Sequence, residues 1–252
     1  MKLETADRFS NRVENYVKYR PGYPPEILDL FQSEMQLQKD SVIADIGSGT
    51  GISAKLFLEN GNRVFGIEPN KAMRGASQEF LEDFENFQAF DATSENTTLA
   101  DNSVDFIIAA QAFHWFRTED TKKEFKRILK KNGWLALIWN ERLLVSNKFL
   151  REYEDFLAEF GTDYKKVRHD QITKKDLEKF FGQNFEQKTF KNSQVFDFEG
   201  LLGRMLSSSY MPSEDNQLFP GMKKTLKRLF AEHERKGKIQ VLYDTNVFYT
   251  RF

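Results

Sequence analysis

The sequence predicts an α/β protein: a Rossmann-like, mostly parallel, seven-stranded sheet with helices on both faces and a helical cap from the N-terminus and C-terminal-half insertions. Three observations predict it. Short apolar segments alternate with amphipathic ones between residues 42 and 140. The segments 104–110 and 134–139 are apolar almost throughout, as strands buried on both faces of a parallel sheet are. Closely spaced glycines at 47–51 follow the first apolar segment.

The core elements follow from this alternation, taken in chain order. Asn70 is the expected N-cap of the second helix, and Asn132-Gly133 is expected to end the third. Five strands are expected at residues 42–46, 63–67, 87–90, 104–110 and 134–139. The helices between them are expected at residues 52–59, 71–81 and 121–130.

The pattern differs on either side of this core. Pro25 favours the start of a helix over residues 25–35, because its missing N–H group has no partner at that position anyway. Beyond residue 140 helices and two late strands are expected. We divide the chain into an N-terminal lid (1–36), a cofactor-binding core (37–140), and remaining strands with helical cap insertions (141–252). The later helices are expected at 147–160, 174–181, 200–209 and 222–236, and the strands at 185–198 and 239–249.

Composition excludes several classes of function. The 252 residues include 40% hydrophobic and 30% charged residues, which is typical of a soluble globular protein. The absence of cysteine excludes disulfides and thiolate zinc sites, and three separated histidines make a metal site unexpected. The net charge of −1 argues against a nucleic-acid partner, and no apolar segment is long enough for a membrane span. Since the first ten residues have no apolar core, we expect a cytoplasmic protein.

The glycine-rich turn indicates a ligand other than a phosphate chain. Gly47 and Gly49 fit the start of the dinucleotide pattern, but Ile52 occupies its third glycine position. Nor does the Gly-Lys-Ser/Thr triplet of nucleotide hydrolases follow Gly51. Asp45, which ends the first strand, would repel a phosphate. It suits a ligand that carries a cationic amine.

Acidic residues also end the second and third expected strands. Glu68 is placed where a carboxylate can accept hydrogen bonds from both hydroxyls of a ribose. Asp91, followed by Ala92, is placed to accept from an exocyclic amine. Because the carboxyl ends of parallel strands meet at one edge, these acids predict a single ligand crevice.

These motifs together resemble those of class I methyltransferases that use S-adenosyl-L-methionine (SAM). The resemblance covers roughly residues 40–140, and it implies methyl transfer from SAM. Four shorter stretches, residues 19–24, 111–115, 139–140 and 207–212, resemble a subgroup near the trans-aconitate methyltransferases. The expected cofactor-binding residues are Arg20, Asp45, Gly47, Ser48, Gly49, Thr50, Gly51, Glu68, Pro69, Asp91, Ala92, Ala110 and Gln111.

The sequence indicates the residues that bind the methyl acceptor less clearly than those that bind SAM. A carboxylate acceptor needs no base, whereas a hydroxyl or amine must lose a proton. His114 is the candidate catalytic base, with a purely structural histidine as the alternative. Arg20, held extended by the following proline, is a candidate to bind a carboxylate of SAM or of the acceptor. The expected acceptor-binding residues are Tyr19, Phe113, Trp115, Asn140, Arg204, Ser208 and Tyr210.

The leading hypothesis is therefore a methyltransferase for a small molecule, with a carboxylate or hydroxyl oxygen as acceptor. Methylation of RNA or protein is an alternative, as is a protein that binds SAM without transferring its methyl group. A hydride-transfer enzyme is the rival on the same fold. The sequence predicts neither the identity of the acceptor nor the oligomeric state.

Overall fold

The computed structural model describes residues 13–116, 118–162, 164, 173–182 and 184–252, so the first twelve residues of the expected lid lie outside it. A seven-stranded sheet has the order β3-β2-β1-β4-β5-β7-β6. Its strands are β1 Val42–Ile46, β2 Arg63–Ile67, β3 Phe87–Phe90, β4 Val104–Ala110, β5 Leu129–Arg142, β6 Glu186–Phe196 and β7 Ile239–Arg251.

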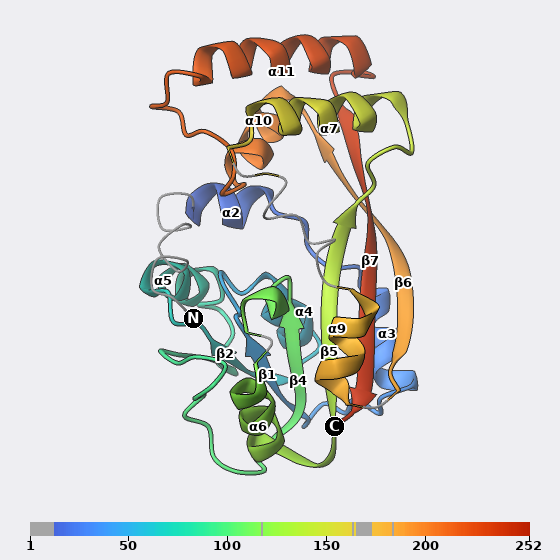
Figure 1. Ribbon diagram of the computed structural model, residues 1–252. Coiled ribbons are helices and arrows are strands. Elements are labelled where there is room, and N and C mark those ends of the chain that lie inside the picture. The colour runs from blue at the N-terminus through green and yellow to red at the C-terminus, as the bar shows by residue number, and fades with distance from the viewer. Residues whose placement is uncertain (1–12, 117, 163, 165–172, 183) are drawn as a thin grey trace.

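The sheet is mostly parallel, which confirms the predicted fold class. Strands β1 to β5 pair in parallel with their neighbours, whereas β7 runs antiparallel to both β5 and β6. β5, β6 and β7 extend beyond the other strands toward the cap (Figure 1). The carboxyl ends of β1, β2 and β4 therefore lie below the cap, where an enclosed site can form.

Helices cover both faces of the sheet. On one face, α6 (Glu119–Ile128) and α9 (Lys174–Phe181) bury Phe125 and Phe180 against the strands. On the other, α3 (Glu26–Ser33) and α4 (Ile52–Glu59) bury Phe31 and Phe57, whose ring centroids lie 5.0 Å apart. The helix expected over residues 25–35 is therefore part of the core layer.

The first turn of α5 (Lys71–Phe80) confirms the predicted cap. Asn70 accepts a hydrogen bond from the backbone N–H of Met73.

The boundary between α6 and β5 corrects the sequence prediction. Thr118 caps α6, so the helix begins two residues earlier than expected. It ends at Ile128, because Leu129 already pairs with Val104 of β4. Asn132-Gly133, expected to end a helix, lies inside β5 instead.

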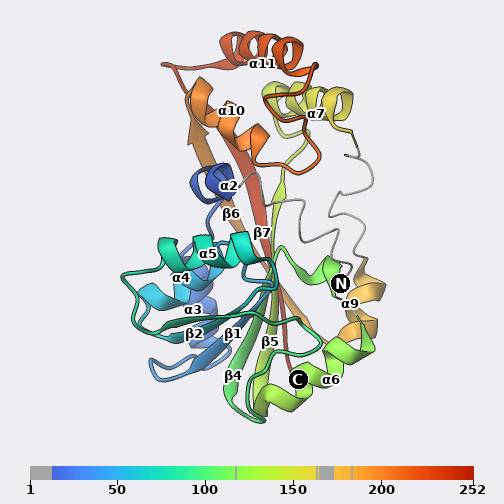
Figure 2. The ribbon, with the colours of Figure 1, turned by 90° about the vertical axis from the view of Figure 1, so that its left-hand side faces the viewer.

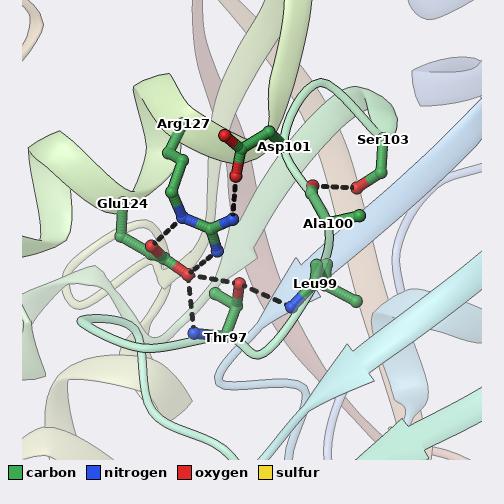
Figure 3. Close-up of polar contacts among 7 residues, drawn as sticks. All are labelled: Thr97, Leu99, Ala100, Asp101, Ser103, Glu124 and Arg127. Carbon is green, nitrogen blue, oxygen red and sulfur yellow. Dashed lines mark hydrogen bonds and ion pairs between the residues drawn. The ribbon is translucent and has the colours of Figure 1, made fainter.

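An ion-pair cluster fastens α6 to the loop that precedes β4 (Figure 3). The Arg127 guanidinium donates to both carboxylate oxygens of Glu124, at 2.8 and 2.7 Å, and to Asp101. Glu124 also accepts from the backbone N–H of Thr97 at 2.7 Å. Although burial acts to raise the pKa of Glu124, these hydrogen bonds lower it to about 2.

A second helical layer forms the cap at the far end of the long strands. There α7 (Lys148–Phe160), α10 (Phe198–Leu206) and α11 (Phe219–His233) share an apolar core with β6 and β7. The helix α2 (Val13–Tyr19) lies between this cap and α5 (Figures 1 and 2). Within the described parts of the chain, no helix combines the length and apolarity needed to cross a bilayer.

Candidate functional site

The glycine loop turns the chain tightly between β1 and α4. The backbone N–H groups of Gly47 and Ser48 donate to the carbonyl of Ile67 at 2.9 and 3.2 Å, which ties the loop to the end of β2. Gly47 has a φ of +69°, and a Cβ atom there would lie 2.7 Å from that of Ala112. Only glycine satisfies both conditions without displacing a neighbour.

Glu68 is held at the loop by two backbone hydrogen bonds. Its Oε2 accepts from the N–H of Gly49 at 2.9 Å, and its Oε1 accepts from the N–H of Asn70 at 2.8 Å. Burial raises the pKa of Glu68, although these bonds and Arg74 lower it in part. A carboxylate fixed in this way keeps free lone pairs for hydroxyl donors of a ligand.

A cavity of about 150 Å³ opens beside this loop. Glu68 and Pro69 line it from β2, and Ala110 and Gln111 from the end of β4. His114 lines it from the short 3₁₀ helix that follows. The wall also contains residues that the sequence did not indicate: Tyr16, Asn70, Met73, Thr93, Ser94 and Glu95.

A second cavity of about 520 Å³ adjoins the first and extends toward the cap. Both cavities are lined by Gly47, Gly49, Ala110 and Gln111, so a ligand in one meets a ligand in the other at the glycine loop. The volume lies within the range of small-molecule sites, roughly 300–1,000 Å³.

Three arginines line the larger cavity: Arg20, Arg142 and Arg204. In the part of the chain that the structure describes, Arg20 and Arg204 form no ion pair, whereas Arg142 pairs with Glu154 at 2.5 Å. Burial and the neighbouring Arg204 lower the pKa of Arg20. The lining also includes two acidic residues, Glu141 and Asp244, of which Asp244 pairs with Lys191 at 2.7 Å.

Tyrosines surround these arginines. Burial acts to lower the pKa of Arg204, but Tyr243 and Tyr153 raise it above its ordinary value. Arg204 Nε donates to the Tyr243 hydroxyl at 3.3 Å, and Arg142 donates to the Tyr164 hydroxyl at 3.0 Å. The lining combines cationic forks with aromatic faces, a combination suited to planar anions.

The structure brings together most of the predicted site residues. The smaller cavity is lined by Arg20, Gly47, Gly49, Glu68, Pro69, Ala110, Gln111, His114, Trp115 and Tyr210. The larger is lined by Arg20, Gly47, Ser48, Gly49, Thr50, Ala110, Gln111, Asn140, Arg204 and Tyr210.

Seven other predicted residues line neither cavity. Asp45 is buried beneath the loop, and Asp91 is 71% exposed in its side chain and pairs with Arg74 at 2.8 Å. The role expected of each stays a prediction, since their carboxylates lie outside both cavity walls. The others are Gly51, Ala92, Phe113 in the core, Tyr19 against the cap, and Ser208, which accepts from Arg204.

Sequence reasoning missed Arg142, Tyr164 and Tyr243 on the acceptor side. Arg142 ends β5 and Tyr243 lies on the antiparallel β7, directly opposite it in the register. No local motif marks these positions. Had the strand expected at residues 134–139 been extended to residue 142, Arg142 would have been placed near the site.

The residues present suit SAM as a ligand. Within the described residues, five buried polar atoms of the cavity walls have no hydrogen-bonding partner: Arg20 Nε, Ser48 Oγ, Thr50 Oγ1, Gln111 Oε1 and Arg142 Nη1. Buried polar groups are normally paired, so such a concentration is typical of a site that receives a polar ligand. Glu68 suits the ribose and Gln111 Oε1 an ammonium group.

The fold and this loop together define a Rossmann-like domain with a nucleoside site at the carboxyl edge of its sheet. Residues 44–137 match the family model described as a methyltransferase domain. An uncharacterized methyltransferase of Schizosaccharomyces pombe is 31% identical over 135 residues, covering 53% of each chain. A "putative methyltransferase" of Dictyostelium discoideum is 25% identical over 247 residues, covering 92% of this chain and 90% of that one.

A solved structure shows the same fold. It is a "putative type II methyltransferase" from Anaeromyxobacter dehalogenans, with a TM-score of 0.64 and 16% identity, covering 92% of this chain and 98% of that chain. The aligned part of this chain spans about half the length of the fission-yeast relative. Residues 44–137 of this chain are thus similar to a methyltransferase domain, in a match that includes the glycine loop, Glu68 and the end of β4.

Proposed function

We propose that this protein transfers the methyl group of SAM to an oxygen of a small anionic molecule, with a carboxylate as the acceptor group. The observation that carries the proposal is the larger cavity, where three arginines converge next to the glycine loop. A guanidinium binds a carboxylate through two parallel hydrogen bonds, which fixes both its position and its orientation.

The proposed chemistry asks the protein mainly for positioning. SAM supplies a methyl group activated by a positively charged sulfur. A lone pair of the acceptor oxygen forms the new bond to the methyl carbon while the carbon–sulfur bond breaks and its electron pair stays on sulfur. A carboxylate oxygen reacts without losing a proton. Holding both partners at reacting distance can be worth about 7–11 kcal/mol.

A variant of His114 distinguishes a hydroxyl acceptor from a carboxylate acceptor. For a hydroxyl acceptor with His114 as the base, His114→Ala would reduce kcat by about 10²–10⁴-fold. For a carboxylate acceptor we expect turnover at saturating substrate to remain within about threefold of the wild type, because no proton has to be removed. His114 lines the smaller cavity and not the larger, which favours the second outcome.

The proposal is tested with SAM carrying a labelled methyl group and a panel of acceptors: mono-, di- and tricarboxylic acids, alcohols, phenols, amines, a mixed peptide pool and RNA. We expect label in the carboxylic acids and its release as methanol on mild alkali, since a methyl ester hydrolyses under those conditions. Label that is stable to alkali, or that enters RNA or protein, contradicts a carboxylate acceptor. If the protein binds SAM but transfers label to no fraction, it is a SAM-binding protein that does not transfer methyl groups.

A further inference from the structure

The segment that carries Arg20 is attached to the extended part of the sheet through side-chain amides. We call residues 19–22, the last residue of α2 and the three that follow it, the strap. Within the strap, Arg20 lines both cavities. Among the described residues the strap pairs with no strand, so its backbone carbonyls need other donors.

Three amide side chains supply these donors. Gln194 Nε2 donates to the carbonyl of Tyr19 at 3.0 Å. Asn192 Nδ2 donates to the carbonyl of Gly22 at 2.9 Å, and Asn140 Nδ2 donates to the same carbonyl at 3.1 Å. Asn140, expected from the sequence to bind the acceptor, thus also lies against the strap. The edge strand β6 therefore binds the strap at Tyr19 and at Gly22, and β5 binds it at Gly22.

Gln194 also connects the strap to the second arginine. Its carbonyl oxygen accepts a hydrogen bond from the Tyr243 hydroxyl at 2.9 Å, and Tyr243 in turn accepts from Arg204 at 3.3 Å. On the other side, Arg20 Nη2 donates to the carbonyl of Ser207 at 2.9 Å. Gln194 thus stands in a continuous polar chain that runs from the strap to Arg204.

The side chain of Tyr19 anchors the strap to the cap. It packs against the apolar core of the cap and lies over Gly203 of α10. A Cβ atom on Gly203 would lie 2.0 Å from the Tyr19 ring, so the helix and the strap approach each other as closely as glycine allows.

We propose that Gln194, with Asn192, is a positioning residue that holds the strap so that Arg20 and Arg204 bind the acceptor together. This inference rests on the proposed function for its effect on catalysis. The bonding pattern requires an amide at residue 194, because the side chain must donate to a carbonyl and accept from a hydroxyl at once. A glutamate keeps the acceptor but loses the donor.

Two variants test the proposal against a matched control. Gln194→Ala removes both hydrogen bonds, and Gln194→Glu removes only the bond to the strap. Gln240→Ala alters an exposed glutamine of the neighbouring β7. We expect KM for the acceptor to rise about fivefold to twentyfold in both Gln194 variants. Part of the free energy of acceptor binding is then used to order the Arg20 side chain. The kcat value, the affinity for S-adenosylhomocysteine and all values for Gln240→Ala should stay within about twofold of the wild type.

Hydrogen–deuterium exchange provides a readout that does not depend on activity. The peptide covering residues 13–24 should exchange faster in both Gln194 variants than in the wild type, and Gln240→Ala should not change it. Unchanged exchange in this peptide would overturn the inference, as would a loss of S-adenosylhomocysteine affinity with no change in KM. If the wild type transfers no methyl group, the proposed function fails, and the exchange experiment still decides whether Gln194 holds the strap.

Discussion

Asp45 lies close to the site, and its carboxylate is outside both cavity walls. Its side chain is fully buried, Oδ2 accepts from Ser53 Oγ at 2.6 Å, and Oδ1 has no hydrogen-bonding partner among the described residues. Burial raises the pKa of Asp45 to about 7, and the bond from Ser53 offsets only part of that effect. The acid therefore supports the glycine loop from below, at a cost in stability when it ionises.

This raised pKa predicts a pH dependence of stability. This carboxyl ionises near pH 3.8 in the unfolded chain and near pH 7 in the folded protein. The protonated carboxyl therefore contributes fully to the free energy of unfolding below pH 3.8, and this contribution is lost as pH rises through 7. We expect the free energy of unfolding of Asp45→Asn to improve relative to the wild type between pH 4 and 7, and the difference to level off above pH 7. Urea denaturation of both proteins across this range measures it. A difference that does not vary with pH contradicts the shift.

Arg142 is the acceptor-site residue with the clearest individual prediction. Its Nη1 is buried without a partner, while Nη2 pairs with Glu154. Arg142→Lys keeps the charge but loses the planar fork, so KM for a carboxylate acceptor should rise about tenfold or more. Calorimetry with S-adenosylhomocysteine serves as the control and should show affinity within about twofold of the wild type. An unchanged KM would remove Arg142 from the acceptor site.

Most predicted elements agree with the observed bounds to within a few residues, including β6 and β7, whereas β5 differs more. β1, β2 and β4 begin and end at the predicted residues because their apolar runs are bounded by polar residues or glycine. β5 begins five residues earlier than predicted and ends three later. At its start only Leu129 has a partner in the register. Residues 130–133 form an irregularity between the pairs Val104–Leu129 and Phe106–Trp134, and Asn132 has a φ of +64°. Such a segment carries no strand pattern in the sequence.

The site residues also differ in how well the sequence predicts them. The glycine loop and Glu68 are local features of β1, β2 and the turns after them, so their spacing alone indicated a nucleoside ligand. Arg142, Tyr243 and Gln194 lie on three strands that come together only through antiparallel pairing. The sequence could not indicate that pairing, because it joins residues up to about a hundred positions apart.

The cluster that fastens α6 gives a prediction at the level of the element. Glu124→Gln leaves Arg127 with a weaker partner and should lower the free energy of unfolding by about 1–3 kcal/mol near pH 7. The folded pKa of about 2 lies below the unfolded value of 4.5, so the wild-type advantage is present above pH 4.5 and shrinks as pH falls toward 2. Urea titrations at several pH values measure it, with Glu119→Gln on the exposed side of α6 as the control. An equal loss in both variants would contradict the account.

On the scale of the whole molecule, the two cavities lie where the core and the cap meet. The smaller is built mainly from β-strand ends and their loops, which is the conserved geometry of an open α/β sheet. The larger draws on α10 of the cap, the prolonged β5 and β7, and the strap. Arg20 and Tyr210 line both cavities, whereas Glu68 lines only the smaller one and Arg142 and Arg204 only the larger one. We therefore expect changes at Arg142 or Arg204 to alter acceptor binding more than cofactor binding.

Calorimetric titration with S-adenosylhomocysteine tests the central claim most directly, namely that the glycine loop and Glu68 form a nucleoside site for SAM. The wild type should bind one equivalent, and Glu68→Ala should weaken binding by about tenfold or more, because the ribose loses its acceptor. Glu59→Gln, on the exposed face of α4, should bind like the wild type. No heat with either S-adenosylhomocysteine or SAM, together with clear binding of NAD in the same protein, would contradict the account.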